Sequence, residues 1–150
     1  MPDYQIRKAR PSDIDAIIAL CKDHAKFEGT YYDKTGKSDQ LSSYIFNENS
    51  LVNCLVVEVD EQIKGYATFM PEFSTWDAAY YLHMDCLYLK PEMRGKGLGI
   101  EIMNLIRKKA KSADYVNVQW QTPVNNFKAV TFYKKIGATP KYKVRFYLGL

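Results

Sequence analysis

The 150-residue chain lacks any long apolar run. No stretch approaches the roughly 18 uninterrupted apolar residues that a membrane-spanning helix needs. The first 20 residues carry charges throughout and contain no apolar block of the kind found in a secretory signal. We therefore expect a cytoplasmic protein with no membrane partner.

Cysteine and histidine are also scarce, with three and two residues respectively. Cys21, Cys54 and Cys86 are odd in number and widely spaced, and no CxxC pair occurs. A disulfide framework needs paired cysteines, and a structural zinc site needs clustered Cys and His ligands. The sequence therefore predicts reduced cysteines and no metal cofactor.

Strong charge of one sign is absent as well. The net charge of +4 comes from 21 basic and 17 acidic residues, which is too mild a bias to indicate a nucleic-acid partner. The first quarter has an acidic cast, and a basic cluster follows at 107–111. This cluster either complements a helix C-terminus or attracts an anionic ligand.

The composition is that of one ordinary folded domain. Hydrophobic residues make up 47% of the chain and charged residues 25%, which excludes intrinsic disorder. No repeat or linker divides the chain, so we expect a single domain over residues 1–150.

Apolar periodicity predicts an alternating order of strands and helices. Strands are predicted at Tyr4–Arg7, Val52–Val59, Ile63–Phe69, Ala79–Leu89, Tyr115–Gln121 and Lys141–Leu148, and helices at 12–26, Asp39–Asn47, Gly97–Ser112 and Asn125–Ile136. A loop containing Pro71, Ser74 and Trp76 separates the third strand from the fourth. A meander followed by crossovers indicates an α/β, or mixed α+β, fold with helices on both faces of a mixed sheet.

The most informative segment reads LYLKPEMRGKGLGI. A predicted strand leads into Gly95, Gly97 and Gly99, and a predicted helix follows at once. Glycine permits φ above zero and lets a ligand approach the backbone N–H groups, which favour phosphate at a helix start. Arg94 and Lys96 add cations at the rim. The turn therefore predicts a phosphate-binding site in preference to a bare connection.

Two common phosphate-binding motifs do not fit this turn. A P-loop requires GK[ST], which does not follow at the necessary distance. A dinucleotide-binding turn requires G-x-G-x-x-G with an acidic residue about 20 positions further on, whereas these glycines are spaced G-x-G-x-G.

The segment Arg94–Gly99 resembles the [R/Q]-x-x-G-x-[G/A] motif of the GNAT superfamily of acetyl-CoA-dependent N-acetyltransferases. Ile6–Ala9, with Asp13 and Ile17, resembles the opening strand and helix of that family. The run Asn126–Ala138 resembles its N-x-x-A-x-x-F-Y segment, so the likeness spans essentially the whole chain.

This resemblance implies a GNAT fold, with a mixed, mostly antiparallel sheet of about six to seven strands and splayed strands 4 and 5. It implies acetyl-CoA as co-substrate, with the pyrophosphate on the turn amides and the pantetheine along the edge of the fourth strand. The residues implied for acetyl-CoA binding are Leu87, Tyr88, Leu89, Arg94, Gly95, Lys96, Gly97, Leu98, Gly99, Ile100, Asn126, Ala129 and Phe132.

Within the superfamily, the sequence Ala-Lys-Phe-Glu ending at Glu28 resembles the A-K-Y-E of spermidine/spermine (diamine) acetyltransferases. Asp85 falls where those enzymes carry a polyamine-binding glutamate. The chain lacks the acidic stretch that the group has near its last strands. The implied acceptor is a small cationic amine, and the residues implied for its binding are Phe27, Glu28, Asp85, Gln119, Trp120 and Gln121.

Tyr133 and Asp85 are the predicted catalytic residues. An alkylammonium has a pKa near about 10.4, so a base must remove its proton at neutral pH, and Asp85 could accept that proton through water. By the resemblance, Tyr133 would protonate the departing thiolate. Structural alternatives are a packed Tyr133, a salt-bridged Asp85, a solvated Glu28, and an Asn126 that caps a helix.

Several functional alternatives stay open at this point. The chain could be a regulatory module that holds acyl-CoA without turnover, an acetyltransferase acting on protein or peptide amines, or a nucleotide-binding protein. We expect a homodimer. Aromatic residues in predicted loops and at strand starts would line either an amine cleft or a dimer interface, namely Tyr31, Tyr32, Phe73, Trp76, Tyr80 and Tyr81.

Overall fold

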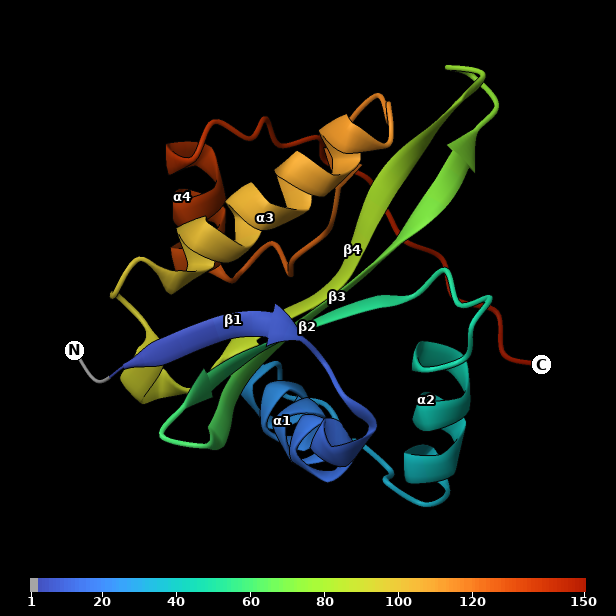
Figure 1. The fold of residues 1–150 in the computed structure, drawn as a ribbon. Coiled ribbons are helices and arrows are strands. Elements are labelled where there is room, and N and C mark those ends of the chain that lie inside the picture. The colour runs from blue at the N-terminus through green and yellow to red at the C-terminus, as the bar shows by residue number, and fades with distance from the viewer. Residues whose placement is uncertain (1–2) are drawn as a thin grey trace. The chain divides into compact units, whose positions relative to one another are not determined.

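A computed structural model describes residues 3–150 of the chain (Figure 1). The chain divides into a first unit, Met1–Trp120, and a second unit, Gln121–Leu150, and each is described by itself. The prediction of a single domain therefore stays a prediction.

The first unit is built on a five-stranded sheet in which neighbours in sequence are neighbours in space. Its strands are β1 (Tyr4–Lys8), β2 (Asn53–Val59), β3 (Gln62–Ser74), β4 (Ala79–Leu89) and β5 (Val118–Gln119). The first four strands run antiparallel, and β5 pairs parallel with β4. The mixed, mostly antiparallel sheet confirms the predicted fold class.

Helices cover both faces of this sheet. They are α1 (Ile14–Phe27), α2 (Lys37–Ile45) and α3 (Leu98–Ser112), and α1 and α3 lie on opposite sides of the strands in Figure 1. Ile17 and Leu20 of α1 join Val56 and Tyr66 of the sheet in one buried cluster. Ile102 and Ile106, on the apolar stripe of α3, are fully buried. Helices α1 and α3 thus each bury an apolar face against the sheet.

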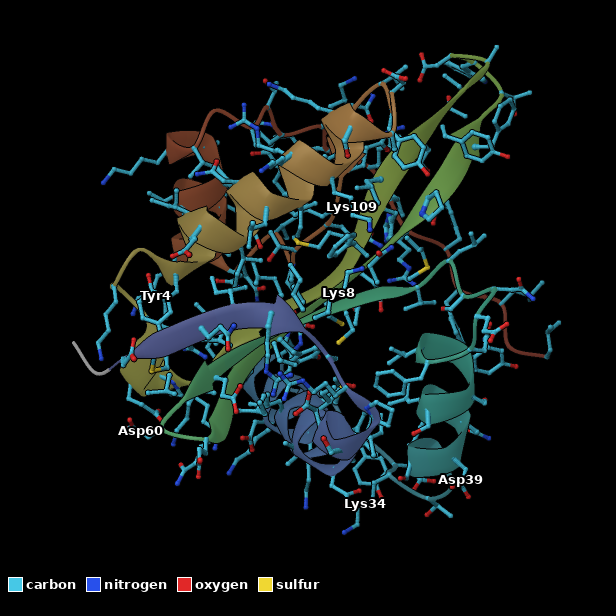
Figure 2. All side chains as sticks on the ribbon, viewed as in Figure 1. Tyr4, Lys8, Lys34, Asp39, Asp60 and Lys109 are labelled. Atoms are coloured by element: carbon cyan, nitrogen blue, oxygen red, sulfur yellow. The ribbon has the colours of Figure 1, made fainter. Side chains whose placement is uncertain are left out.

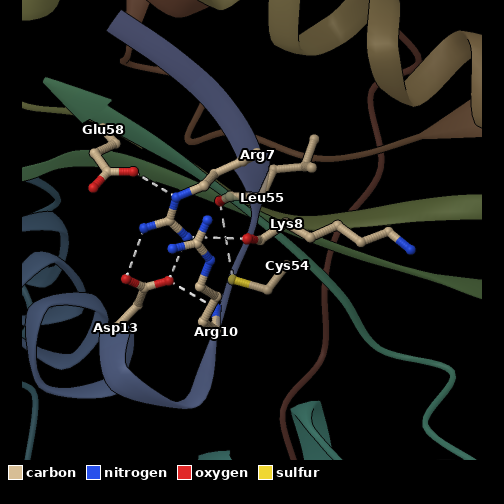
Figure 3. Close-up of polar contacts among 7 residues, drawn as sticks. All are labelled: Arg7, Lys8, Arg10, Asp13, Cys54, Leu55 and Glu58. Carbon is tan, nitrogen blue, oxygen red and sulfur yellow. Dashed lines mark hydrogen bonds and ion pairs between the residues drawn. The ribbon is translucent and has the colours of Figure 1, made fainter. Parts of the chain in front are cut away.

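The ends of the first strand are fixed by polar contacts. The Tyr4 hydroxyl, labelled in Figure 2, donates to Glu101 of α3 at 2.7 Å. The Arg7 guanidinium donates to both carboxylate oxygens of Asp13, at 2.7 and 3.0 Å, and its Nε donates to Glu58 (Figure 3). Asp13 also accepts the backbone N–H of Arg10 at 2.7 Å, so the turn into α1 is tied to the sheet.

One predicted strand, Ile63–Phe69, was too short, and another, Tyr115–Gln121, was too long. The strand starting at Ile63 continues to Ser74, because it pairs with β4 all the way to Ala79. Pro71 is tolerated there since it lies beyond Phe69, the last residue of β3 that pairs with β2, so one side of the strand is already an edge. Of the strand predicted at Tyr115–Gln121, only the two residues of β5 form a strand.

The sheet therefore has five strands, not six to seven. The second unit contains α4 (Phe127–Lys135), as predicted, but residues 141–148 form no strand. The prediction of a strand at Lys141–Leu148 from the alternation of side chains is therefore wrong, because a strand also needs a neighbour to supply its hydrogen bonds. Among residues 3–150, no helix is both long and apolar enough to cross a membrane.

Candidate active site

The glycine turn joins β4 to α3 through a short 3-10 turn at Pro91–Met93. Gly95 and Gly97 both adopt left-handed backbone conformations, with φ of 73° and 84°. A Cβ built on either residue would meet no atom within 4 Å, so packing alone does not require glycine here. The backbone conformation requires it, and the open space on this side is available to a ligand.

The N-terminus of α3 is uncapped. Gly97 is the N-cap residue and offers no side chain, and the first N–H of the helix that bonds back to Gly97 belongs to Glu101, at 3.1 Å. The N–H groups of Leu98, Gly99 and Ile100 precede that bond, at the end of the helix where the dipole is positive. The turn therefore fits a phosphate-bearing substrate.

Strand β4 is irregular at Asp85. Thr68 of β3 pairs with Cys86, and the next residue, Phe69, pairs with Met84, so Asp85 has no cross-strand partner. This β-bulge places an exposed carboxylate at the point where the strand changes direction. The neighbouring Cys86 thiol donates to the Asp85 carboxylate at 3.6 Å.

The edge of β4 beyond the bulge is open within the first unit. Pairing with β5 covers only Leu82 with Val118 and His83 with Gln119. Strand β4 then continues for six residues to Leu89 without a first-unit neighbour on that side. The predicted splay of the fourth and fifth strands is confirmed, and the open edge can accept an extended chain in the manner of an added strand.

The Arg94 side chain turns back toward α1. Its Nε donates to the Leu89 carbonyl at 2.9 Å, and its guanidinium carbon lies 4.6 Å from the Phe27 ring centroid and 5.3 Å from that of Tyr88. The structure thus brings together two residues predicted to bind acetyl-CoA, Arg94 and Tyr88, and one predicted to bind the acceptor amine, Phe27. These contacts join the Arg94 side chain to β4 and α1, whereas the sequence predicted a cation at the rim of the turn.

Glu28 is held by a contact within α1. His24 Nε2 lies 3.3 Å from its carboxylate, one helical turn away, and His24 Nδ1 lies 3.0 Å from the Tyr66 hydroxyl. The His24 ring also stacks on Tyr88 at 5.2 Å. A chain of contacts therefore runs from the buried Tyr66 through His24 to Glu28 at the end of α1.

The cysteine beside Asp85 is a protonated thiol. Burial, reinforced by the nearby Asp85 carboxylate, raises the pKa of Cys86 to about 12. Burial likewise raises the pKa of Cys54 to about 12 and that of Cys21. Since the thiolate is the nucleophilic form, these cysteines are poor nucleophiles at neutral pH.

The remaining predicted acceptor residues lie around β5. Gln119 is exposed and donates to the side chain of Asn117 at 3.0 Å, whereas Trp120 is half-buried. Gln121 is exposed and belongs to the second unit.

The second unit carries the other predicted catalytic residue. Asn126 is the N-cap of α4, and its side-chain oxygen accepts the Ala129 N–H at 3.2 Å. This confirms the alternative in which Asn126 caps a helix. Phe132 and Tyr133 follow on the helix, with ring centroids 5.2 Å apart. Both rings are half-buried.

The sequence matches the model of the acetyltransferase (GNAT) family over residues 17–138, which is most of the chain. The chain belongs to the GNAT acetyltransferase family. It is an N-acetyltransferase, as the resemblance predicted.

Curated relatives of this acetyltransferase cover most of its length. It is 27% identical to the mouse thialysine N-epsilon-acetyltransferase, over 92% of this chain and 85% of the relative. It is 25% identical to the Caenorhabditis elegans protein of the same name, over 91% and 83%. A human spermidine/spermine N(1)-acetyltransferase-like protein 1 is 24% identical, with 92% of this chain matching 21% of that longer protein. These relatives confirm the predicted group.

Solved structures share the fold of the acetyltransferase. An aminoglycoside acetyltransferase from an uncultured soil metagenomic sample superposes with a TM-score of 0.82 at 16% identity, covering 98% of this chain and 96% of that one. A ribosomal-protein-alanine N-acetyltransferase from Brucella melitensis superposes with a TM-score of 0.71 at 16% identity, covering 96% and 100%. At this identity the likeness shows the fold alone.

Sequence reasoning missed two features of this acetyltransferase. The bulge at Asp85 depends on pairing between β3 and β4, which no local pattern reports. The role of His24 in bridging Tyr66 and Glu28 was also missed. Its spacing of four residues before Glu28, on one helix face, is the signal that could have indicated half of this contact. In the described part of the chain, no group of His, Cys, Asp and Glu is placed to hold a metal ion.

Proposed function

We propose that this acetyltransferase transfers the acetyl group of acetyl-CoA to the primary amine of a small cationic acceptor. The observation that carries the use of acetyl-CoA is the uncapped N-terminus of α3 behind two left-handed glycines. Three N–H groups there would bind the pyrophosphate, because a helix N-terminus favours phosphate. The open edge of β4 beside them would pair with the amide groups of the pantetheine arm.

Direct attack within a ternary complex is the mechanism that this site supports best. The acceptor nitrogen forms a bond to the thioester carbonyl carbon, and the carbon–sulfur bond then breaks. An acetyl-cysteine intermediate would need a thiolate, and Cys86, the cysteine beside the bulge, has a pKa raised to about 12. The chain therefore brings the two substrates together and leaves the bond formation to them.

Two protons must move during this reaction. The acceptor ammonium must lose a proton before it attacks, and the exposed Asp85 carboxylate at the bulge would receive that proton through water. The leaving thiolate must gain one, and the Tyr133 hydroxyl would donate it. A phenol with a pKa near about 10 is a suitable donor to an alkyl thiolate.

A cationic acceptor is favoured by the residues around α1 and β4. Glu28 and Asp85 offer carboxylates, and Phe27 is a half-exposed ring that already lies under the guanidinium of Arg94. An aromatic face and a carboxylate are the groups that bind an alkylammonium. The relatives named for thialysine and for spermidine/spermine act on amines, which supports an acceptor such as a diamine, a polyamine or an amino acid with a side-chain amine.

An acceptor panel tests this proposal. Release of free thiol from acetyl-CoA is measured with thialysine, spermidine, a short diamine, a neutral amine and a peptide with a free N-terminus. We expect turnover with the small cationic amines. Turnover only with the peptide would assign protein amines as acceptors. Thermal stabilisation by acetyl-CoA without turnover on any amine would indicate a regulatory acyl-CoA-binding module.

A further inference from the structure

The His24 side chain of α1 is enclosed by aromatic side chains of the sheet. Its ring stacks on Tyr88, with centroids 5.2 Å apart and planes inclined by 24°, and meets the Tyr66 ring edge-on at 6.1 Å. Only 17% of the His24 side chain is exposed, and Tyr66 and Tyr88 are buried. Close packing of this kind leaves the imidazole little freedom to rotate, so its two nitrogens face fixed directions.

The partners of the two nitrogens indicate which one carries the hydrogen. Nδ1 lies 3.0 Å from the Tyr66 hydroxyl, and Nε2 lies 3.3 Å from the Glu28 carboxylate. A carboxylate can only accept, whereas a phenol can donate. Burial raises the pKa of Tyr66 above its ordinary value, so the phenol keeps its hydrogen. We therefore assign the neutral ring a hydrogen on Nε2, facing Glu28, and a lone pair on Nδ1 that accepts from Tyr66.

Helix stability does not explain the position of Glu28. It is the C-cap residue of α1, and the negative end of the helix dipole disfavours a carboxylate there. A basic residue four positions before an acidic one is also the less favourable order along a helix. The Glu28 side chain is 37% exposed. A partly exposed carboxylate in this place is suited to binding a cation from outside the helix.

The end of α1 lies against the part of β4 that leads into the glycine turn. The Phe27 ring meets the Tyr88 ring at 6.4 Å, and the Arg94 guanidinium lies over both rings. Glu28 directly follows Phe27, so its carboxylate belongs to the helix end that contacts the turn. An acceptor amine bound at Glu28 would therefore be near the turn at which acetyl-CoA is proposed to bind.

We propose that His24 is a positioning residue, which holds the Glu28 carboxylate ready for the positively charged acceptor amine. This inference rests on the proposed function, in which Glu28 binds the acceptor. A glutamate side chain loses rotamer entropy when it is ordered, and the contact with His24 imposes that order before the acceptor arrives. A neutral imidazole offers a hydrogen to the carboxylate without cancelling its charge. The charge remains available to the acceptor, and it attracts a dication more than a monocation.

Two uncharged amide substitutions separate positioning from packing. A Gln side chain carries its amide nitrogen as many bonds from Cα as the Nε2 of histidine, whereas an Asn side chain ends at the level of Nδ1. His24→Gln can therefore still reach Glu28, and His24→Asn cannot. We expect His24→Asn to raise the KM for a diamine about threefold with kcat unchanged, and His24→Gln to keep a KM near that of the parent. Equal changes in the two folded variants would assign His24 to packing and overturn the proposal, as would an unchanged KM in His24→Asn.

Glu28→Gln distinguishes a failure of this inference from a failure of the proposed function. It should raise the KM for the diamine about tenfold, and His24→Asn should add nothing in that background, because the two residues act through one contact. An additive effect of the two substitutions would overturn the proposal. An unchanged KM in Glu28→Gln would show that the acceptor binds away from α1 and would contradict the proposed function as well. A raised KM in Glu28→Gln with a normal KM in His24→Asn would overturn the role of His24 alone.

NMR spectroscopy tests the arrangement of His24 without acceptor or turnover. The chain has two histidines, so the variant His83→Gln leaves only the imidazole signals of His24. Near about pH 9, where an ordinary imidazole is neutral, long-range proton–nitrogen correlations should show the hydrogen on Nε2. Tyr66→Phe removes the donor to Nδ1, and a part of the rings should then carry the hydrogen on Nδ1. A hydrogen on Nδ1 in the presence of Tyr66, or a spectrum that Tyr66→Phe leaves unchanged, would overturn the proposal.

Discussion

The carboxylate of Asp13 is buried and accepts three hydrogen bonds, two from Arg7 and one from the Arg10 N–H. The bidentate contact with the Arg7 guanidinium, more than any other cause, lowers the pKa of Asp13 below its usual value. Burial opposes this shift but does not cancel it. The charged form of Asp13 is therefore part of the folded state.

We predict that Asp13→Asn lowers the free energy of unfolding by about 3 kcal/mol at neutral pH, because it leaves Arg7 partly unpaired in a buried place. The unfolded chain binds the proton at higher pH than the folded chain. The Asp13 contribution is thus complete above the ordinary Asp pKa of about 3.9 and is lost as the pH falls through the lower, folded value. Denaturant unfolding between pH 7 and pH 3 measures it. The exposed Asp15 on the same helix provides the control, and an equal loss in Asp15→Asn would contradict the assignment.

We predict that Tyr133→Phe lowers kcat by about 10²-fold, the usual contribution of one positioned acid or base, while the Kd for acetyl-CoA changes little. The variant removes only a hydroxyl from a half-buried ring that packs near Phe132. Titration calorimetry and steady-state kinetics separate the two quantities. Tyr31→Phe, at a highly exposed ring of the first unit, should leave both unchanged. Normal turnover in Tyr133→Phe would assign this tyrosine to packing.

At the scale of elements, the N-terminus of α3 at the glycine turn can be compared with the N-terminus of α2 in the same chain. Gly97 and Gly36 are both left-handed N-cap residues, of α3 and α2, with φ of 84° and 71°, and neither helix has a side-chain cap. A valine at either position would strain the backbone itself. Asparagine tolerates left-handed φ and still adds a side chain.

We predict that Gly97→Asn weakens binding of acetyl-CoA by about tenfold or more, equivalent to 1.4 kcal/mol, because its side chain enters the open space in front of the helix N-terminus. Gly36→Asn should fold equally well and bind acetyl-CoA as the parent does. Thermal shift with and without acetyl-CoA reports both effects. Equal affinities in the two variants would place the phosphate site elsewhere.

The elements that sequence predicted well are those with local causes. Helices α1 and α3 follow from apolar residues at helical spacing, and the glycine turn follows from the need for positive φ. Prediction failed where distant pairing decides the outcome. Strand β3 continues through Pro71 because β4 lies beside it. Residues 141–148 have the alternation of a strand but form none in the described second unit. Alternation along the chain indicates a strand, but the strand forms only where an adjacent strand supplies its hydrogen bonds.

Within the site, residue types were easier to predict than contacts. The turn and the cap at Asn126 follow from short motifs. The stacking of Arg94 on Phe27, and the contact of His24 with Tyr66, join residues more than 40 positions apart. Such contacts follow from helix α1 lying across the sheet, which no local spacing reports.

At the scale of the whole molecule, charge is divided along the chain. Residues 1–95 contain 15 acidic and ten basic residues, and residues 96–150 contain two acidic and 11 basic residues. A hollow along α3 is lined by Arg107, Lys108, Lys111 and Asn104. The acidic part carries Glu28 and Asp85, and the basic part begins at the glycine turn. This division suits a cationic acceptor and an anionic acetyl donor, since each would meet charge of the opposite sign.

The KM values for both substrates should therefore rise with ionic strength, because exposed charges are screened over roughly 8 Å at physiological salt. We expect a steeper rise for a diamine than for a monoamine, since the diamine carries a second charge. Asp85→Asn should lower kcat/KM more for the diamine than for the monoamine and should flatten the difference in salt dependence between them. Asp77→Asn, on the β3–β4 hairpin, removes one exposed charge of the same unit and controls for net charge. Steady-state kinetics at 50 and 300 mM salt, where the screening length is about 1.7 and about 0.7 times its physiological value, measure these changes. If Asp85→Asn lowered kcat/KM equally for both amines, Asp85 would act on the reacting nitrogen alone, and the second charge of a diamine would be bound by another residue.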